Sequence, residues 1–145
     1  MYSFLAAQTG GTFDLSDLLR TQIVMVVSAF DYYVHEVTRF GMVEIISGAR
    51  APTPAFDRFS IPMGSVVQGM ASPGTTSWLE DAVRAAHGHL SFQDPDKVAD
   101  ALRLISPAIV WEQVGAVLGM GAVQLKNELK AIIRRRNQIA HEADQ

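Results

Sequence analysis

Apolar residues recur at steps of three and four over a long N-terminal segment, and no other pattern constrains the fold as strongly. The residues that keep this period are Leu15, Leu18, Leu19, Ile23, Val26, Val27, Phe30, Val34 and Val37. Such spacing is typical of a helix that buries one face. Asp14 is a suitable N-cap and Gly48 a suitable terminator, so we predict a helix over about residues 14–47, with Gly41 as a weak point. No strand-like alternation of useful length occurs, which predicts an all-α fold.

Capping residues and helical periodicity predict four further helices, over about residues 77–88, 94–105, 106–119 and from 121 to near the C-terminus. The first begins with a capping box at residues 77–80. Asp94-Pro95 and Ser106-Pro107 each combine an N-cap with a first-turn proline. His87 and His89 flank a glycine at a helix end and are expected at the surface. The last helix carries an apolar stripe that we expect to be buried: Leu125, Leu129, Ile132 and Ile133.

Prolines and glycines interrupt every attempted period between residues 49 and 76. We predict a long ordered loop there, with a helical turn near residues 65–70. Its large apolar side chains are expected to hold it on the core: Phe56, Phe59 and Ile61. The chain, residues 1–145, is then one domain, a bundle of about five helices of which two are long. It could also be a fragment of a longer protein.

The composition favours a folded domain inside the cell. Apolar residues make up 48% of the chain, which is enough for a buried core. Cysteine is absent, so disulfides and thiolate metal sites are excluded. The N-terminus does not resemble a signal peptide, and the longest apolar run, residues 23–27, is far shorter than the ~20 residues that span a bilayer. We therefore expect a cytoplasmic protein without a membrane partner.

Positive charge is concentrated near the C-terminus, although the net charge of the chain is −3. Five of the twelve basic residues lie within eleven positions: Lys126, Lys130, Arg134, Arg135 and Arg136. An RNA partner would therefore meet a local basic patch. Because successive helical residues turn by ~100°, Arg136 should lie beside the apolar stripe, whereas Arg134 and Arg135 should reach solvent.

Arg136, Asn137 and His141 form a set that suits phosphodiester cleavage. Histidine titrates near neutral pH and can move a proton. Arginine offers a planar fork of donors to phosphate oxygens, and asparagine can orient either group. Arg136 and His141 are five positions apart, about 140° around a helix. One helix face cannot present both, so the set suits a cleft between two packed surfaces.

Asp31 and His35 of the first long helix are candidate supporting residues. An arginine beside the core needs a partner, because an unpaired buried charge is costly. Asp31, one turn after Val27 on the apolar side, is the candidate partner of Arg136. The spacing of Asp31 and His35 could hold a metal, but no third ligand is evident, so no metal is expected. Polar contacts with the final helix, a position in the cleft, or a structural role remain for them.

The residues from Arg136 to His141 have the R-x4-H form of the HEPN superfamily motif, with the polar residue that typically follows its arginine. The helix around them, residues 129–144, resembles the final helix of the RiboL-PSP HEPN domains. Residues 29–36 resemble the first helix of that branch, and Trp111 with Leu118-Gly119 also looks similar. The resemblance covers most of the chain from about residue 15.

This resemblance implies a HEPN-like helical bundle and a metal-independent endoribonuclease of bacterial conflict systems that needs no cofactor. In such enzymes the ribose 2′-hydroxyl attacks the adjacent phosphate, and two motif copies meet across the cleft of a homodimer. On this sequence Arg136 would steady the phosphate, His141 would transfer a proton and Asn137 would position them. Arg134 and Arg135 would contact RNA. An antitoxin or a fused regulatory domain is the expected further partner.

Two other functions remain open. A HEPN-like domain without catalytic activity could serve only for dimerisation or RNA binding. Residues 110–130 also have the outline of a helix-turn-helix DNA reader, but the second helix begins with the apolar run of residues 121–123, where such a reader exposes polar groups. Phe30, Tyr32 and Tyr33 could stack on bases, although packing in the core or in a dimer is the preferred interpretation.

Overall fold

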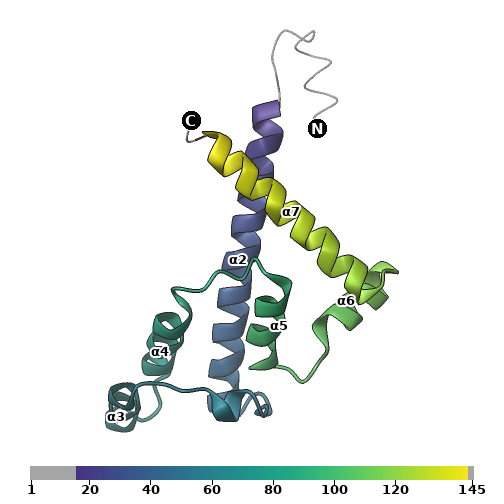
Figure 1. The fold of residues 1–145 in the computed structure, drawn as a ribbon. Helices are drawn as coiled ribbons and strands as arrows, with labels where there is room; N and C mark the ends of the chain where they lie inside the picture. The colour runs from purple at the N-terminus through teal and green to yellow at the C-terminus, as the bar shows by residue number, and fades with distance from the viewer. Residues whose placement is uncertain (1–15, 144–145) are drawn as a thin grey trace.

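The computed structural model describes residues 16–143, and this part of the chain is all-helical, as predicted. Its elements are α2 (Ser16–Ile46), the 3₁₀ helix η1 (Phe56–Arg58), α3 (Met63–Ala71), α4 (Ser77–His87), α5 (Pro95–Arg103), α6 (Val110–Leu118) and α7 (Ala122–Ala143). The long helices α2 and α7 cross near the N-terminal half of α2, whereas α3, α4 and α5 lie at its other half (Figure 1). Within the described range, no helix has both the length and the apolar character that a membrane crossing requires.

The C-terminal half of α2 is the centre of the core. One buried cluster joins α2 to α5 and to the segment before α5: Val34, Phe92, Val98 and Ala101. A second cluster joins α2 to α4 and to the residues after α5: Met42, Leu79, Val83 and Ile105. Full burial of a side chain of this size stabilises the fold by about 1.5–3 kcal/mol. These two clusters therefore hold α4 and α5 against α2.

Gly41 lets α2 and Ile105 approach closely. A Cβ at Gly41 would lie 2.7 Å from the Cγ2 atom of Ile105, nearer than real carbon contacts allow. The helix runs through this position without a break, so the expectation of a weak point is wrong. The glycine is there because packing leaves no room for a side chain.

An ion network also ties α2 to α4. Arg39 is only 5% exposed; its Nη2 lies 2.7 Å from Glu36 Oε2, and its Nη1 binds Glu80. The hydrogen bond from Arg39 lowers the pKa of Glu36, and the same bond raises the pKa of Arg39. Glu80 therefore does not close the capping box predicted at Ser77. The N-cap is Thr76, whose hydroxyl donates to Glu80 at 3.2 Å.

The segment 49–76 is more regular than predicted. It contains η1 and the nine-residue helix α3, where the sequence predicted a loop with a single turn. This helix accounts for the six α-helices of the described range, where about five were predicted. The hydroxyl of Thr53 donates to two carbonyl groups at the end of α5, at 2.8 and 3.0 Å. Phe56 and Phe59 pack against the second core cluster, as predicted.

The two predicted Asp/Ser-Pro helix starts differ in outcome. Asp94 is the N-cap of α5 and accepts hydrogen bonds from two backbone N–H groups of the first turn, at 2.8 and 3.4 Å. The start predicted at Ser106-Pro107 is wrong, because α6 begins at Val110. Ser106 instead accepts a hydrogen bond from the N–H of Ala108, which holds a turn before the helix. Gly119 ends α6 with a φ of 67°, as predicted.

The N-terminal half of α2 is less buried than its period predicted. Val27 is 3% exposed, but Leu18, Leu19 and Val26 are 38%, 37% and 65% exposed. Among the described helices, α7 is the one that crosses this half of α2 (Figure 1), and a two-helix crossing cannot enclose a whole apolar face. The predicted N-cap Asp14 lies outside the described residues.

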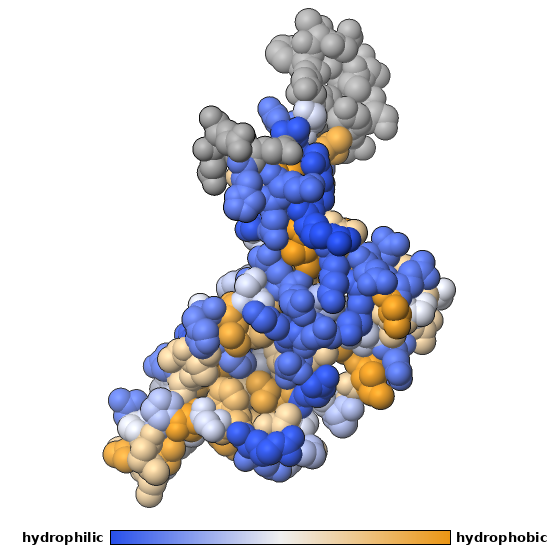
Figure 2. Space-filling model, in the orientation of Figure 1, coloured by the Kyte–Doolittle hydropathy of each residue, from blue (hydrophilic) through white to orange (hydrophobic). Residues whose placement is uncertain are grey.

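Polar and apolar surfaces are separated on the visible side of the molecule. Figure 2 shows mainly hydrophilic residues over the crossing of α7 and α2, and apolar residues gathered over α3 and α4. On α3, Met63, Val67 and Met70 are 74%, 58% and 78% exposed. The C-terminal half of α7, which includes residues 136–141, lies at this hydrophilic crossing (Figures 1 and 2), so polar side chains are concentrated there.

Candidate active site

Arg136 lies on the face of α7 that packs against α2. Five of the partly buried residues of α7 follow steps of three and four: Leu125, Leu129, Ile133, Arg136 and Ala140. Ile139 is 7% exposed and, with Ala140, borders a groove shared with the first turns of α2. Ile132, predicted in the buried stripe, is 49% exposed, so that assignment is wrong. The inward position of Arg136 is confirmed.

The Arg136 guanidinium is held by its neighbour and is not neutralised. Its Nη1 donates to the Asn137 side-chain oxygen at 3.2 Å. Its Nε is buried without a hydrogen-bond partner, and no carboxylate among the described residues forms an ion pair with it. A buried donor without an acceptor costs about 1–3 kcal/mol, more when the group is charged. An unpaired buried donor of this kind calls for an explanation, and an anion that binds the guanidinium would provide one.

Asp31 does not pair with Arg136, so the predicted partnership is wrong. Asp31 Oδ1 accepts a hydrogen bond from the backbone N–H of Phe92 at 2.5 Å, and the Ser91 hydroxyl lies 3.5 Å away. These residues belong to the connector between α4 and α5, which passes α2 just below α7 in Figure 1. A partly buried backbone N–H needs a hydrogen-bond acceptor, and the Asp31 carboxylate supplies one for the N–H of Phe92. Asp31 therefore positions this connector.

His35 and His87 enclose the same connector. The ring of His35 lies 4.4 Å from that of Phe92, centroid to centroid, and His87 meets Phe92 edge-on at 5.6 Å. His87 is 7% exposed, so its predicted surface position is wrong, whereas His89 is exposed as predicted. Burial lowers the pKa of His87, and the nearby imidazoles of His35 and His89 add to this effect. Among residues 16–143, no group of three or more acidic or histidine side chains is arranged to hold a metal.

His141 is exposed in the last turns of α7, where a substrate can reach it. It shares a face with Asn137, four residues earlier, while Arg136 lies on the partly buried face of α7. Within one chain, Arg136 and Asn137 are therefore in contact, whereas His141 lies on a different side of α7 from Arg136. The sequence geometry predicted this division of the set over an edge of the helix.

Arg134 and Arg135 are both exposed, as predicted. Arg134 and Asn137 line a groove of about 380 Å³ between α7, the first turn of α5 and residues 91–94. Lys97 and Lys130 also line it. Lys130 belongs to the basic cluster that the sequence shows, whereas neither Lys97 nor the connector was predicted to lie at this site. The Asp94-Pro95 helix start, which places Lys97 in the first turn of α5, was the signal in the sequence that could have indicated it.

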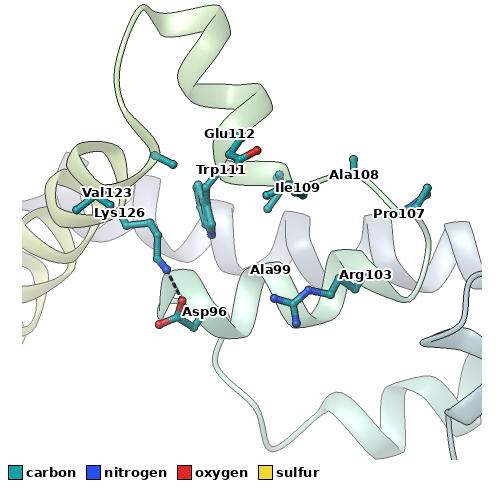
Figure 3. Close-up of a pocket in the computed structure, with 12 residues that line it drawn as sticks. Asp96, Ala99, Arg103, Pro107, Ala108, Ile109, Trp111, Glu112, Val123 and Lys126 are labelled. Atoms are coloured by element: carbon teal, nitrogen blue, oxygen red, sulfur yellow. Dashed lines mark hydrogen bonds and ion pairs between the residues drawn. The ribbon is translucent and has the colours of Figure 1, made fainter.

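Other cavities lined in part by α7 lie at its two ends. One, of about 580 Å³, lies between the first turns of α2 and the Ile139–Ala140 turn of α7. The other, of about 450 Å³, lies between α5, α6 and the start of α7 (Figure 3). There the Trp111 indole donates to the Pro95 carbonyl at 2.8 Å, and Lys126 pairs with Asp96 across the cavity. The bond from Lys126 lowers the pKa of Asp96. The Trp111 indole and the Lys126 amine thus hold α6 and α7 to α5, which indicates a structural role for both side chains.

Comparison with known proteins adds no relative. No protein-family model matches the chain, and neither a curated protein nor a solved structure shows significant similarity to it.

Proposed function

We propose that this chain is a metal-independent endoribonuclease of the HEPN type that acts as a homodimer. The observation that carries the proposal is the state of Arg136: a partly buried guanidinium, hydrogen-bonded to Asn137, with no anionic partner among the described residues. A phosphate is an anion of suitable geometry for such a fork of donors. The exposed imidazole of His141 on the same helix supplies a side chain that can transfer a proton.

The proposed reaction needs only RNA. The oxygen of a ribose 2′-hydroxyl attacks the adjacent phosphorus, and the bond from phosphorus to the 5′-oxygen of the next nucleotide breaks. The 2′-hydroxyl proton leaves to a base, and the departing 5′-oxygen takes up a proton. The products are a 2′,3′-cyclic phosphate and a 5′-hydroxyl. His141 serves in this proton transfer, and Arg136 stabilises the charge that develops on the phosphate oxygens.

A second copy of the chain would complete the site. Arg136 and His141 lie on different sides of α7, so the Arg136 of one copy and the His141 of another can face a common phosphate more easily than two groups of one helix. The N-terminal half and the middle of α2 support this arrangement, because apolar side chains there remain exposed in the single chain: Leu18, Leu19, Met25, Val26, Tyr32 and Tyr33. Pairing two copies would bury them.

The test is cleavage of RNA by the purified protein in EDTA. The wild-type protein should yield discrete fragments that end in a cyclic phosphate and a 5′-hydroxyl. His141→Ala should lower the rate by at least ~10²-fold, and Arg136→Ala by about 10²–10³-fold. His89→Ala is the matched control, since His89 is exposed and lines none of the cavities described beside α7.

Activity in His141→Ala equal to that of the wild type would exclude this mechanism. RNA binding without cleavage by any form would instead favour a non-catalytic RNA-binding module. Cytoplasmic action in bacterial defence or toxin-like growth arrest, restrained by an antitoxin or a fused domain, is the biological setting that we propose. Growth arrest on expression of the wild type but not of His141→Ala would support it.

A further inference from the structure

The groove beside the Arg136–His141 segment has two unlike walls. One wall is a face of α7, on which Lys130, Arg134 and Asn137 follow one another at helical spacing. The other wall is the connector before α5 together with Lys97 in the first turn of that helix. Cations therefore stand on both sides of a space of about 380 Å³. This volume is at the lower end of the ~300–1,000 Å³ that small-molecule sites enclose.

The positive charge of this groove is largely uncompensated. Neither Lys97 nor Arg134 takes part in an ion pair within the described part of the chain. Lys130 lies 4.0 Å from Asp96, whose carboxylate already binds Lys126. The acid that lines the groove is Asp94, and its Oδ1 is occupied by two backbone N–H groups. An anion between the walls would meet Lys97 on one side and Arg134 on the other.

The same face of α7 continues to His141. Lys130, Arg134, Asn137 and His141 are spaced by four, three and four residues, which keeps them on one side of the helix. His141 then lies one turn beyond Asn137, about 6 Å along the axis. A chain that lies in the groove along α7 would lead directly to the imidazole.

We propose that this groove binds single-stranded RNA at the nucleotide next to the cleaved phosphate, with Lys97 and Arg134 on its phosphate groups. The proposal deepens the endoribonuclease function and rests on it for the position of the cleaved bond. The partly buried Gln93, the Ser91 hydroxyl and the Asn137 amide supply donors and acceptors for a base edge or a ribose hydroxyl.

The size and the walls of the groove favour a single strand. A duplex presents its bases stacked and paired, whereas sequence-selective proteins read RNA mainly where bases are splayed out. A positively charged groove that follows the backbone is also the common feature of single-strand binding sites. Asp31 acts here indirectly, as a positioning residue, because its hydrogen bond to Phe92 fixes the connector that forms one wall.

The experiment measures binding of a fluorescein-labelled single-stranded oligoribonucleotide by fluorescence anisotropy over a range of salt. All proteins carry His141→Ala, so that the RNA stays intact. In this background Lys97→Ala/Arg134→Ala should weaken binding about tenfold near 0.15 M salt and reduce the slope of log K against log salt by about 1.4, since each lost contact to a single strand removes about 0.7. Both side chains are exposed, so the variant should fold normally.

The matched control is Arg58→Ala/Arg84→Ala, which removes the same charge from exposed positions on η1 and α4. It should keep the affinity and the salt slope of the parent. An equal loss in both double variants, no loss in the groove variant, tighter binding of a duplex of the same sequence, or no RNA binding by the parent would each overturn the proposal.

The two proposals fail in different ways. If the groove variant loses RNA affinity but the wild-type protein does not cleave RNA, the groove stands and the nuclease function falls. If the wild type cleaves RNA through His141 and Lys97→Ala/Arg134→Ala leaves kcat/KM and the choice of cleavage sites unchanged, the function stands and the groove is overturned.

Discussion

Asp31 shows how one side chain can link the core of this protein to its candidate active site. Its carboxylate lies on α2 and accepts the N–H of Phe92, while the next residues of the same connector face Arg134 and Asn137. Arg136, by contrast, keeps its charge without an acidic partner in the described range. Asp31 thus fixes the connector that forms one wall of the groove, and the Arg136 guanidinium is left to bind an anion.

Replacing Asp31 tests this role. Asp31→Ala leaves the Phe92 N–H without an acceptor, which should lower the free energy of unfolding by about 1–3 kcal/mol. The loosened wall should also raise KM for RNA while kcat stays near the wild-type value. Asp31→Asn retains an acceptor oxygen and should restore most of both properties. Thermal unfolding and cleavage kinetics give the answer, and an Asp31→Ala protein as stable as the wild type would refute the interpretation.

His87 should make stability depend on pH. Its pKa is lowered in the fold, chiefly by burial. Below its usual pKa near 6.5 the unfolded chain therefore takes up a proton that the folded chain does not. The contribution of His87 is thus at its full value above pH ~6.5 and is lost as the pH falls towards its lower pKa in the fold.

His87→Phe retains a ring between Phe59 and Phe92 and removes the nitrogen Nδ1, which is buried and has no hydrogen-bond partner among the described residues. The fall in Tm between about pH 7.5 and about pH 5.5 should be smaller than in the wild type. His141→Gln, at an exposed position that is not among the causes of the lowered His87 pKa, should retain the wild-type fall. An unchanged pH dependence in His87→Phe would assign the effect to other groups.

At the scale of the elements, α2 has two unlike halves. Its C-terminal half is enclosed by α4 and α5 and carries the buried ion network of Arg39, Glu36 and Glu80. Its N-terminal half contacts α7 and leaves apolar residues exposed. The periodicity of the helix is the same in both halves, so the difference comes from what packs against them.

Gly41→Ala probes the enclosed half. The added methyl group would meet Ile105 at 2.7 Å. Overpacking costs about 1–3 kcal/mol, and the better helix propensity of alanine offsets about 1 kcal/mol of this. We expect a net loss of about 1 kcal/mol and a Tm lower by ~2–5 °C. Gly64→Ala in α3 meets open space and should leave the Tm unchanged or raise it; equal behaviour of the two variants would argue against close packing at Gly41.

At the scale of the whole molecule, the exposed face of α2 bears on the proposed homodimer. Val26 is 65% exposed in the single chain, and Val117 on α6 is 86% exposed. A charge at a buried interface is costly, whereas at a solvent-exposed site it is nearly neutral. Val26→Glu should therefore convert a dimer to a monomer and abolish RNA cleavage, while Val117→Glu should remain a dimer.

Size-exclusion chromatography with light scattering measures the mass of each protein. A wild-type protein that is monomeric at concentrations where it cleaves RNA would refute the dimeric site. A Val26→Glu protein that stays dimeric would place the interface elsewhere.

The sequence by itself determined the all-α class, the two long helices, the inward turn of Arg136 and the exposure of Arg134 and Arg135. These properties depend on the 3.6-residue period, which is local and visible in the order of residues. Only the tertiary structure decided that Asp31 serves the Phe92 N–H, that His87 is buried, and that Lys97 stands across a groove from Arg134. Each of these contacts joins segments that are distant in the chain. A periodic pattern shows which face of a helix is buried, but it does not show which distant backbone group or helix packs against that face.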